Sequence, residues 1–359
     1  MENITNEDFL QLVKIVQNMQ QKIMNLEQAN QVLIKSNKQL FEWLQDTIDE
    51  NEDYKQNVRF EIQAEVKEDK EYWYPNIKSG REAIDRIVRE GCSMARFGDG
   101  EFAAIAGRIR HKFQTTDDKK LAERLKEVLN SKDNKLLIGI AEFLGTMILI
   151  ILIADNYGCL QQYNEQAQRE IRRYLKREVR KEHLELLNKD TCYYDAYVTR
   201  PYVMYADNRT DAPRKRFENL KHIWEGRDCI LVEGKQTRLG VGNDLFDNAN
   251  SIKRIIAPAV NAFENYDNIY SECIKQKKED LFLIALGPTA TVLAYDLYKA
   301  GYQAVDVGHV DLEYEWFLKG EGHRTYVEGK YNNELKGGEH PIEIIDLEYN
   351  KQVITDISR

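Results

Sequence analysis

Hydrophobic positions repeat every seven residues between residues 9 and 48, and a second series follows the first by four positions. The first series is Leu12, Met19, Leu26, Leu33 and Leu40, and the second is Val16, Ile23, Asn30, Asn37 and Leu44. This is the heptad pattern of a coiled coil, with the first series at d and the second at a. Asparagine at a favours two parallel strands in fixed register. We therefore expect a parallel homodimer through residues 9–48; the alternative is a single amphipathic helix lying on the globular part.

The composition changes after the heptads. Residues 49–70 are charged and carry no apolar stripe, and no proline or glycine occurs before Pro75. They form either a linker or an outward continuation of the helix. We expect three parts: a coiled coil over residues 1–55, a linker over 56–74 and a globular domain over 75–359.

Beyond residue 75, short apolar runs alternate with segments of helical periodicity. Ser79 and Glu82 have the spacing of a capping box, and Gly91 is placed to end the helix that they begin. The predicted strands cover residues 92–97, 136–140, 228–233, 252–257, 281–286 and 303–307. The further predicted helices cover residues 121–129, 163–188, 261–276 and 289–300. This alternation predicts an α/β fold with a Rossmann-like, mostly parallel sheet and helices on both faces.

One segment, residues 136–154, is apolar almost throughout and long enough for a membrane helix. Gly139, Glu142 and Gly145 interrupt it. We expect a short buried strand at 136–140, followed from residue 143 by a core helix.

Charge and cysteine content narrow the class of protein. The 51 basic and 60 acidic residues give a formal net charge of −9, which disfavours a nucleic-acid partner. The five cysteines are scattered, with no CxxC pair, so we expect reduced thiols rather than disulfides or a zinc site. The start of the chain lacks the features of a secretion signal, and we expect a cytoplasmic protein.

Charged residues and glycines follow four of the predicted strands. In a parallel sheet, ligands bind outside the carboxyl ends of the strands, so these segments are expected to meet. They are Asp99–Glu101, Glu233–Asp244, Gly287–Thr289 and Gly308–Glu315. Each also has a simple structural explanation, as a turn, a loop or a helix start.

The residue types in these segments suit a metal and a diphosphate. Asp99 and Glu101 offer carboxylate oxygens, the ligands that Mg²⁺ and Mn²⁺ prefer. Ions bound in this way commonly bind substrate phosphates as well. A helix beginning near Thr289 presents free N–H groups to a phosphate. His309, at a strand end and close to several acidic residues, is placed for a metal or phosphate role. On a helix, the carboxylates of Asp311 and Glu315 share one face.

Several familiar templates are absent from the chain. No GxxxxGK[ST], HExxH or GxSxG motif occurs, and GVGNDL lacks the third glycine of a dinucleotide fingerprint. The remaining interpretation is a divalent metal with a diphosphate at the edge of a parallel sheet.

Five stretches in this order resemble the GT-D-fold glycosyltransferases, bacterial enzymes first described as a domain of unknown function. They are RFGDGE with a following FQ, RPY at 200–202, VEG…RLGVGNDLFDNA at 232–249, LGPTATVLAYDL at 286–297 and GHVDLEYEW at 308–316. The resemblance covers residues 75–335. The coiled coil has no counterpart in it, and we expect that part to pair subunits or to dock a partner enzyme.

The resemblance implies an inverting, metal-dependent transfer of a sugar, typically glucose, from a UDP-sugar to a cell-surface glycan or glycoprotein. The metal is commonly Mn²⁺, with Mg²⁺ as the alternative. The family's DXE motif maps onto Asp99 and Glu101, and its GH-x-D segment places His309 near the metal and the diphosphate. The catalytic base is carried over to Glu313 or Glu315.

The residues predicted to bind the substrates come from the same segments. Arg238 would supply positive charge, and the glycines after it would let backbone N–H groups approach a diphosphate. The full predicted set is Arg96, Arg200, Glu233, Arg238, Gly240, Gly242, Asn243, Asp244, Gly287 and Thr289.

Two other functions stay open at this point. One is a metal-dependent phosphohydrolase that uses the same residues to activate water against a nucleotide diphosphate. The other is a non-catalytic coiled-coil scaffold that binds a nucleotide. Residues 143–154 are either core or a peripheral contact at the inner face of the membrane, and residues 320–359 are either an acceptor lid or a surface tail.

Overall fold

The computed structural model describes residues 6–55, 73–108, 118–145, 162–174, 177–335, 337–342 and 344–358. The chain divides into two compact units, Met1–Val58 and Arg59–Arg359. The predicted boundaries at residues 55 and 74 stay predictions.

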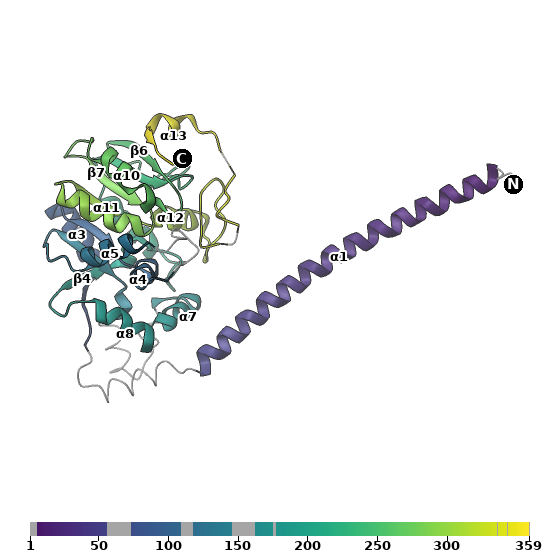
Figure 1. Cartoon of the computed structure of the whole chain (residues 1–359), viewed down its shortest axis with the longest axis horizontal. Coiled ribbons are helices and arrows are strands. Elements are labelled where there is room, and N and C mark those ends of the chain that lie inside the picture. Colours follow the sequence, from purple (N-terminus) through teal and green to yellow (C-terminus); the bar gives the residue numbers. More distant parts are fainter. Residues whose placement is uncertain are drawn as a thin grey trace. The chain divides into compact units, whose positions relative to one another are not determined.

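The first unit is one helix, α1 (Asn6–Lys55), as the heptads predict (Figure 1). The apolar heptad side chains that the structure describes are exposed in the single chain; Leu26 and Leu33 have 69% and 59% of their surface accessible. Within the described residues, no helix combines the length and the apolar character needed to cross a membrane.

In the described part of the second unit, nine strands form one sheet and all pair in parallel. The strands are β1 (Asn76–Lys78), β2 (Ser93–Arg96), β3 (Leu136–Ile140), β4 (Cys192–Asp195), β5 (Asp228–Gly234), β6 (Ser251–Ala257), β7 (Leu281–Ala285), β8 (Gln303–Asp306) and β9 (Val353–Asp356). Their order across the sheet is β1-β4-β3-β2-β8-β7-β5-β6-β9. The predicted α/β fold with a parallel sheet is confirmed, and six of these strands were predicted.

Helices connect the strands. They are α3 (Gly80–Glu90), α4 (Asp99–Ile105), α5 (Lys119–Leu129), α7 (Glu165–Tyr174), α8 (Arg177–Leu186), α9 (Ala212–Lys221), α10 (Tyr266–Cys273), α11 (Pro288–Lys299), α12 (Val310–Lys319) and α13 (Leu347–Gln352), with short 3₁₀ helices η1 (Glu142–Leu144), η3 (Ala196–Thr199) and η4 (Ala262–Asn265). The capping box is present: the Ser79 hydroxyl accepts from the Glu82 N–H, and the Glu82 carboxylate accepts from the Ser79 N–H at 3.0 Å.

Two predicted helices fall partly outside the described residues. The span 163–188 holds α7 and α8, and residues 175–176 between them lie outside the description. After β3 the chain forms η1, and most of the helix predicted from residue 143 also lies outside it.

The core lies on both faces of the sheet because β3, β7 and the middle of β5 are buried, apolar runs, as is typical of parallel sheets. On one face, α5, α10 and α11 bury side chains such as Leu125, Ile269 and Leu293 against the strands (Figure 1). On the other, α3 packs on β4 and contacts α9. Strands β2 and β8 lie side by side in the sheet. The chain connects β2 to β1 and β3 on one side and connects β8 to β7 and β9 on the other, so the direction of the connections reverses between β2 and β8, and ligands bind at such a switch point.

Candidate active site

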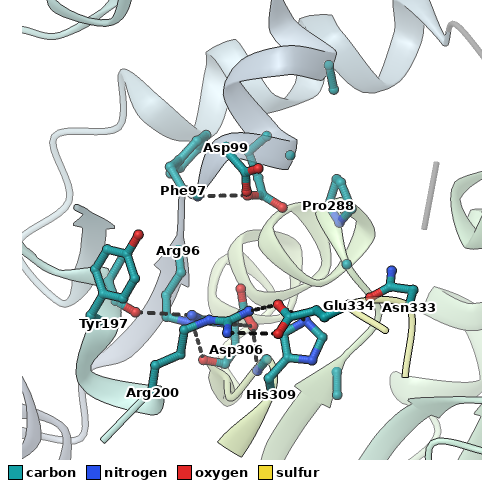
Figure 2. Close-up of a pocket in the computed structure, with 18 of the residues that line it drawn as sticks. Arg96, Phe97, Asp99, Tyr197, Arg200, Pro288, Asp306, His309, Asn333 and Glu334 are labelled. Carbon is teal, nitrogen blue, oxygen red and sulfur yellow. Dashed lines mark hydrogen bonds and ion pairs between the residues drawn. The ribbon is translucent and has the colours of Figure 1, made fainter. Parts of the chain in front are cut away.

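A cavity of about 800 Å³ opens at the carboxyl ends of β2 and β8 (Figure 2). All four predicted strand ends contribute to it, chiefly the turn after β2, the start of α11 and the start of α12. The segment after β5 contributes only Thr237 and Leu239 among the described residues. The wall also includes Tyr197 from η3, Arg200, and Arg324 and Glu334 from the loop after α12.

Arg96 ends β2 and holds the neighbouring strand β8 at its carboxyl end. Its guanidinium donates to the carboxylate and the main-chain oxygen of Asp306, each at 2.9 Å, and to the main-chain oxygen of Ala196 at 3.1 Å. Gly308 makes room for it, because a Cβ there would lie 1.9 Å from Arg96 Nη2 and the φ angle is +48°. In this structure Arg96 is therefore paired with the carboxylate of Asp306.

Asp99 and Glu101 both line the cavity from the first turn of α4. The Glu101 carboxylate accepts from the Gly98 N–H at 2.7 Å, so it caps its own helix. Burial raises the pKa of Glu101 to about 7, and the negative charge of Asp306 adds to the increase. Figure 2 shows Asp99 above Asp306, with Arg96 beside them.

Asp99 and Glu101 fit a hard divalent cation, because a cation would stabilise the charged carboxylate of Glu101, which burial first and repulsion from Asp306 second disfavour. Within the described residues, no three acidic, cysteine or histidine side chains form a ready-made metal site. Two carboxylates suit a Mg²⁺-type ion that takes its other ligands from water and substrate phosphates. His309 lies beside Glu334 in Figure 2, on the far side of the cavity from Asp99.

The start of α11 brings Gly287 and Pro288 into the cavity wall. The positive end of the helix dipole therefore faces the cavity. Thr289 is buried and is not among the described residues that line the cavity. The Thr291 hydroxyl, one turn into the helix, donates to the main-chain oxygen of Arg96 at 2.8 Å and holds α11 on β2.

The glycine-containing loop after β5 packs against other parts of the chain. Arg238 donates to the main-chain oxygen of Ile344 at 2.7 Å and lies over the ring of Tyr349, 4.9 Å from its centroid. The Gly240 N–H donates to Asp311 at 2.9 Å. Arg238, Gly240 and Gly242 are not among the described residues that line the cavity.

The other predicted substrate ligands of this loop are also engaged elsewhere. Glu233 is fully buried, accepts from the Leu239 N–H at 2.6 Å and pairs with Arg254 at 2.7 Å. Asn243 donates to both Asp311 and Glu315. Asp244 is exposed and pairs with Lys221 at 3.1 Å. Of the ten predicted substrate ligands, the structure brings Arg96, Arg200 and Gly287 to the cavity.

Asp311 and Glu315 share one face of α12, as predicted, and that face binds Lys330. The Lys330 ammonium is buried and donates to Asp311 at 2.7 Å and to Glu315 at 2.8 Å. Asp311 reaches the cavity wall, whereas Glu315 is not among the described lining residues. This ion pair fixes the loop after α12 to the helix.

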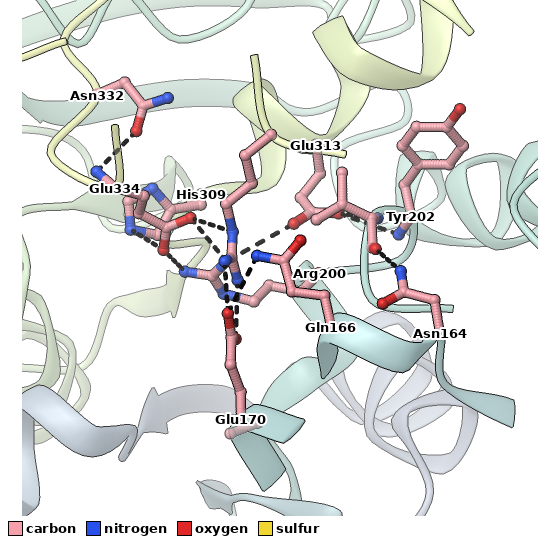
Figure 3. A network of polar contacts seen from close by, with 12 residues as sticks. Asn164, Gln166, Glu170, Arg200, Tyr202, His309, Glu313, Asn332 and Glu334 are labelled. Atoms are coloured by element: carbon pink, nitrogen blue, oxygen red, sulfur yellow. Dashed lines mark hydrogen bonds and ion pairs between the residues drawn. The ribbon is translucent and has the colours of Figure 1, made fainter. Parts of the chain in front are cut away.

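Glu313 faces the opposite way on α12 and is fully buried. Its Oε2 accepts from the N–H groups of Tyr202 at 3.1 Å and Val203 at 2.9 Å, and Oε1 lies 3.7 Å from Arg200 (Figure 3). Burial raises the Glu313 pKa to about 7, although Arg200 acts in the other direction. Glu313 is not among the described lining residues either, and the base role of Glu313 or Glu315 stays a prediction.

Three basic side chains surround one carboxylate at the cavity wall (Figure 3). Arg200 bonds both oxygens of Glu334, Arg324 Nε lies 3.0 Å from Oε2, and His309 Nε2 lies 3.7 Å from Oε1. Burial acts to raise the pKa of Glu334, but Arg200, His309 and Arg324 hold it well below its ordinary value. Glu170 of α7 binds Arg324 at 2.9 Å.

Several of these lining residues were not predicted. Asp306 is the last residue of β8, which was predicted as 303–307, so the rule that placed Asp99 would have found it with the strand end one residue earlier. Arg324 and Glu334 lie in an irregular loop and carry no local sequence signal. Because both line the cavity, this part of residues 320–359 is not a surface tail.

Comparison with known proteins places the globular unit among glycosyltransferases. A family model described as "Glycosyltransferase GT-D fold" matches residues 94–335. The chain is 34% identical over 278 residues to "Probable glycosyl transferase Gly" of Streptococcus gordonii, a match that covers 77% of this chain and 38% of that protein. It is 34% identical over 283 residues to "Glycosyltransferase GlyD" of Streptococcus pneumoniae serotype 4, covering 78% and 32%. The chain thus spans between about a third and two fifths of these relatives.

Solved structures give the same result. One, described as "The highly conserved domain of unknown function 1792 has a distinct glycosyltransferase fold", matches with a TM-score of 0.71 at 32% identity and covers 83% of this chain and 99% of that chain. A second, "A New Glycosyltransferase (DUF1792) from Streptococcus sanguinis", matches with a TM-score of 0.69 at 32% identity, covering 79% and 99%.

Proposed function

Because the chain belongs to the family of glycosyltransferases with the GT-D fold, we propose that it transfers a sugar, predicted to be glucose, from a UDP-sugar to a glycan or glycoprotein. The observation that carries this proposal is the pairing of opposite charges around one cavity. Asp99 and Glu101 line one side, while Arg200, Arg324 and His309 line another. The net charge of the protein, −9, repels a nucleotide diphosphate, so binding one requires local positive charge from a cation and from basic side chains.

The leaving group is where the protein's charges act. As the bond from the sugar to the diphosphate breaks, negative charge grows on the phosphate oxygens. Arg200, Arg324 and the first turn of α11 face the space in which that charge would develop. A divalent cation held by Asp99 and Glu101, Mn²⁺ or Mg²⁺, would supply further positive charge for the diphosphate.

Inversion needs one base to take the proton of the acceptor hydroxyl as it attacks the sugar. Glu313 and Glu315 are the proposed bases. Glu315 pairs with Lys330 and Glu313 with backbone N–H groups, so either residue must leave its present partners to act. Asp311, which lies on the same face of α12 as Glu315, reaches the cavity wall from the first turn of that helix.

The exposed apolar positions of α1 support a proposed parallel dimer, with docking of a partner enzyme as the alternative use of the same helix. We place the reaction in the cytoplasm, at the inner face of the membrane. A membrane contact through residues 143–154 lies largely outside the described residues.

Product analysis with UDP-glucose and Mn²⁺ tests the proposed activity. A transferase releases UDP and moves glucose to an added glycan, and this release stops in Asp99→Asn. Asp133→Asn is a matched control, because its exposed carboxylate lies near Lys299 and not at the cavity. Release of UMP and glucose phosphate would show the phosphohydrolase instead. Binding of UDP without any product from UDP-sugars would leave the scaffold.

A further inference from the structure

Asn333 is buried in the cavity wall, and its side-chain amide has no partner among the residues that the structure describes. Its side chain lines the cavity, and only 7% of its surface is accessible. Within the described parts of the chain, neither its Nδ2 nor its Oδ1 makes a hydrogen bond. Leaving a buried amide unsatisfied is unfavourable, because the group has lost its hydrogen bonds to water. This amide therefore has unused capacity to donate and to accept.

The residues on both sides of Asn333 are bonded to fixed parts of the fold. Lys330 is held by Asp311 and Glu315 of α12, and the Tyr331 N–H donates to the main-chain oxygen of Gln236 at 2.8 Å. On the other side, Glu334 is held by Arg200 and Arg324. The segment is thus held on both sides of Asn333, and Figure 2 shows Asn333 beside Glu334.

The neighbouring Asn332 closes the turn. Its N–H donates to the main-chain oxygen of Gly338 at 2.8 Å, and its Oδ1 accepts from the Glu334 N–H at 2.9 Å (Figure 3). Gly338 must lack a side chain, because a Cβ there would lie 2.2 Å from the main-chain oxygen of Asn332. Asn332 therefore shapes the turn, and Asn333 is presented by it.

We propose that Asn333 binds the sugar-nucleotide donor through both atoms of its amide. An amide recognises a ligand edge that carries a hydrogen-bond donor and a hydrogen-bond acceptor side by side. Two parts of the donor have such an edge: a pair of adjacent sugar hydroxyls and the imide edge of the uracil base. This inference rests on the proposed function, since it takes the donor to be a UDP-sugar.

The test combines stability and binding, because the two readouts move in opposite directions for a ligand-binding amide. Asn333→Leu replaces the unsatisfied amide with an apolar group of similar shape, so we expect the Tm to stay equal or to rise. The Kd for the donor should weaken about tenfold or more through the lost hydrogen bonds. Asn332→Leu is the matched control: it removes the acceptor of the Glu334 N–H and should lower the Tm.

Titration calorimetry with UDP and with UDP-glucose, each with Mn²⁺, separates the two sources of the edge. Equal weakening for both ligands assigns the amide to the nucleotide, and weakening for UDP-glucose alone assigns it to the sugar hydroxyls. An unchanged Kd for both ligands, or unfolding of both Asn333→Leu and Asn333→Ala, would overturn the inference. If the wild-type chain binds neither ligand, the proposed function itself fails, and the inference fails with it.

Discussion

Replacing Gly308 with alanine tests the contact that positions the two strands at the cavity. The new Cβ would lie 1.9 Å from Arg96 Nη2, so the guanidinium must move away from Asp306. The φ angle of +48° adds strain for any residue with a side chain, about 1–2 kcal/mol. Loss of the partner of a buried carboxylate adds about 3 kcal/mol. We expect a total loss of about 4–5 kcal/mol in the free energy of unfolding.

Gly301→Ala is a matched control. Gly301 also has a positive φ, +85°, but a Cβ there would have nothing within 4 Å. It should therefore show the strain alone, about 1–2 kcal/mol. Urea unfolding followed by circular dichroism measures both variants.

A double-mutant cycle identifies the cause. In an Arg96→Ala background the obstructing group is gone, so Gly308→Ala should cost no more than the strain. If Gly308→Ala is no less stable than Gly301→Ala, or if its cost is the same without Arg96, the reasoning about this contact is refuted.

Further predictions concern ionisation, the ion pair on α12 and the coiled coil. Folding raises the Glu313 pKa from 4.5 to about 7, so its protonation favours the folded state below pH 4.5 and this contribution is lost as the pH rises through 7. Glu313→Gln should therefore flatten the decline in unfolding free energy between pH 4.5 and 7, by about 3 kcal/mol; an unchanged slope contradicts the shift. Lys330→Met leaves two carboxylates without their cation and should cost about 3–5 kcal/mol, partly recovered by adding Asp311→Asn, and no recovery would contradict the pairing. Leu26→Glu should halve the mass measured by light scattering from twice the 42.0 kDa of one chain, while Gln28→Glu on the outer face should not; a monomeric wild type contradicts the dimer.

The main elements of the fold follow from local patterns. The capping box from Ser79 to Glu82 and the apolar runs of β3, β5 and β7 each carry their own signal, and the structure has them. Strands β1, β4 and β9 have three or four residues and mix polar with apolar positions, so their pairing depends on neighbours distant in sequence.

The site is predictable as far as strand ends determine it. Asp99, Glu101 and His309 reach the cavity because parallel strands bring their carboxyl ends to one edge. Arg238 does not, because its partners, Ile344 and Tyr349, come from the far end of the chain. The local composition of a glycine-containing loop is the same whether the loop binds phosphate or packs against the rest of the chain. Only its tertiary contacts distinguish these two roles.

Binding of UDP to the purified chain, measured by calorimetry with and without Mn²⁺, tests the central claim most directly. ADP and GDP serve as controls for the base, and Asp99→Asn for the carboxylate that faces the cavity. The account predicts binding that requires Mn²⁺, prefers uridine and disappears in Asp99→Asn. Metal-dependent binding without preference for a base, or no binding at all, would contradict a UDP-sugar transferase.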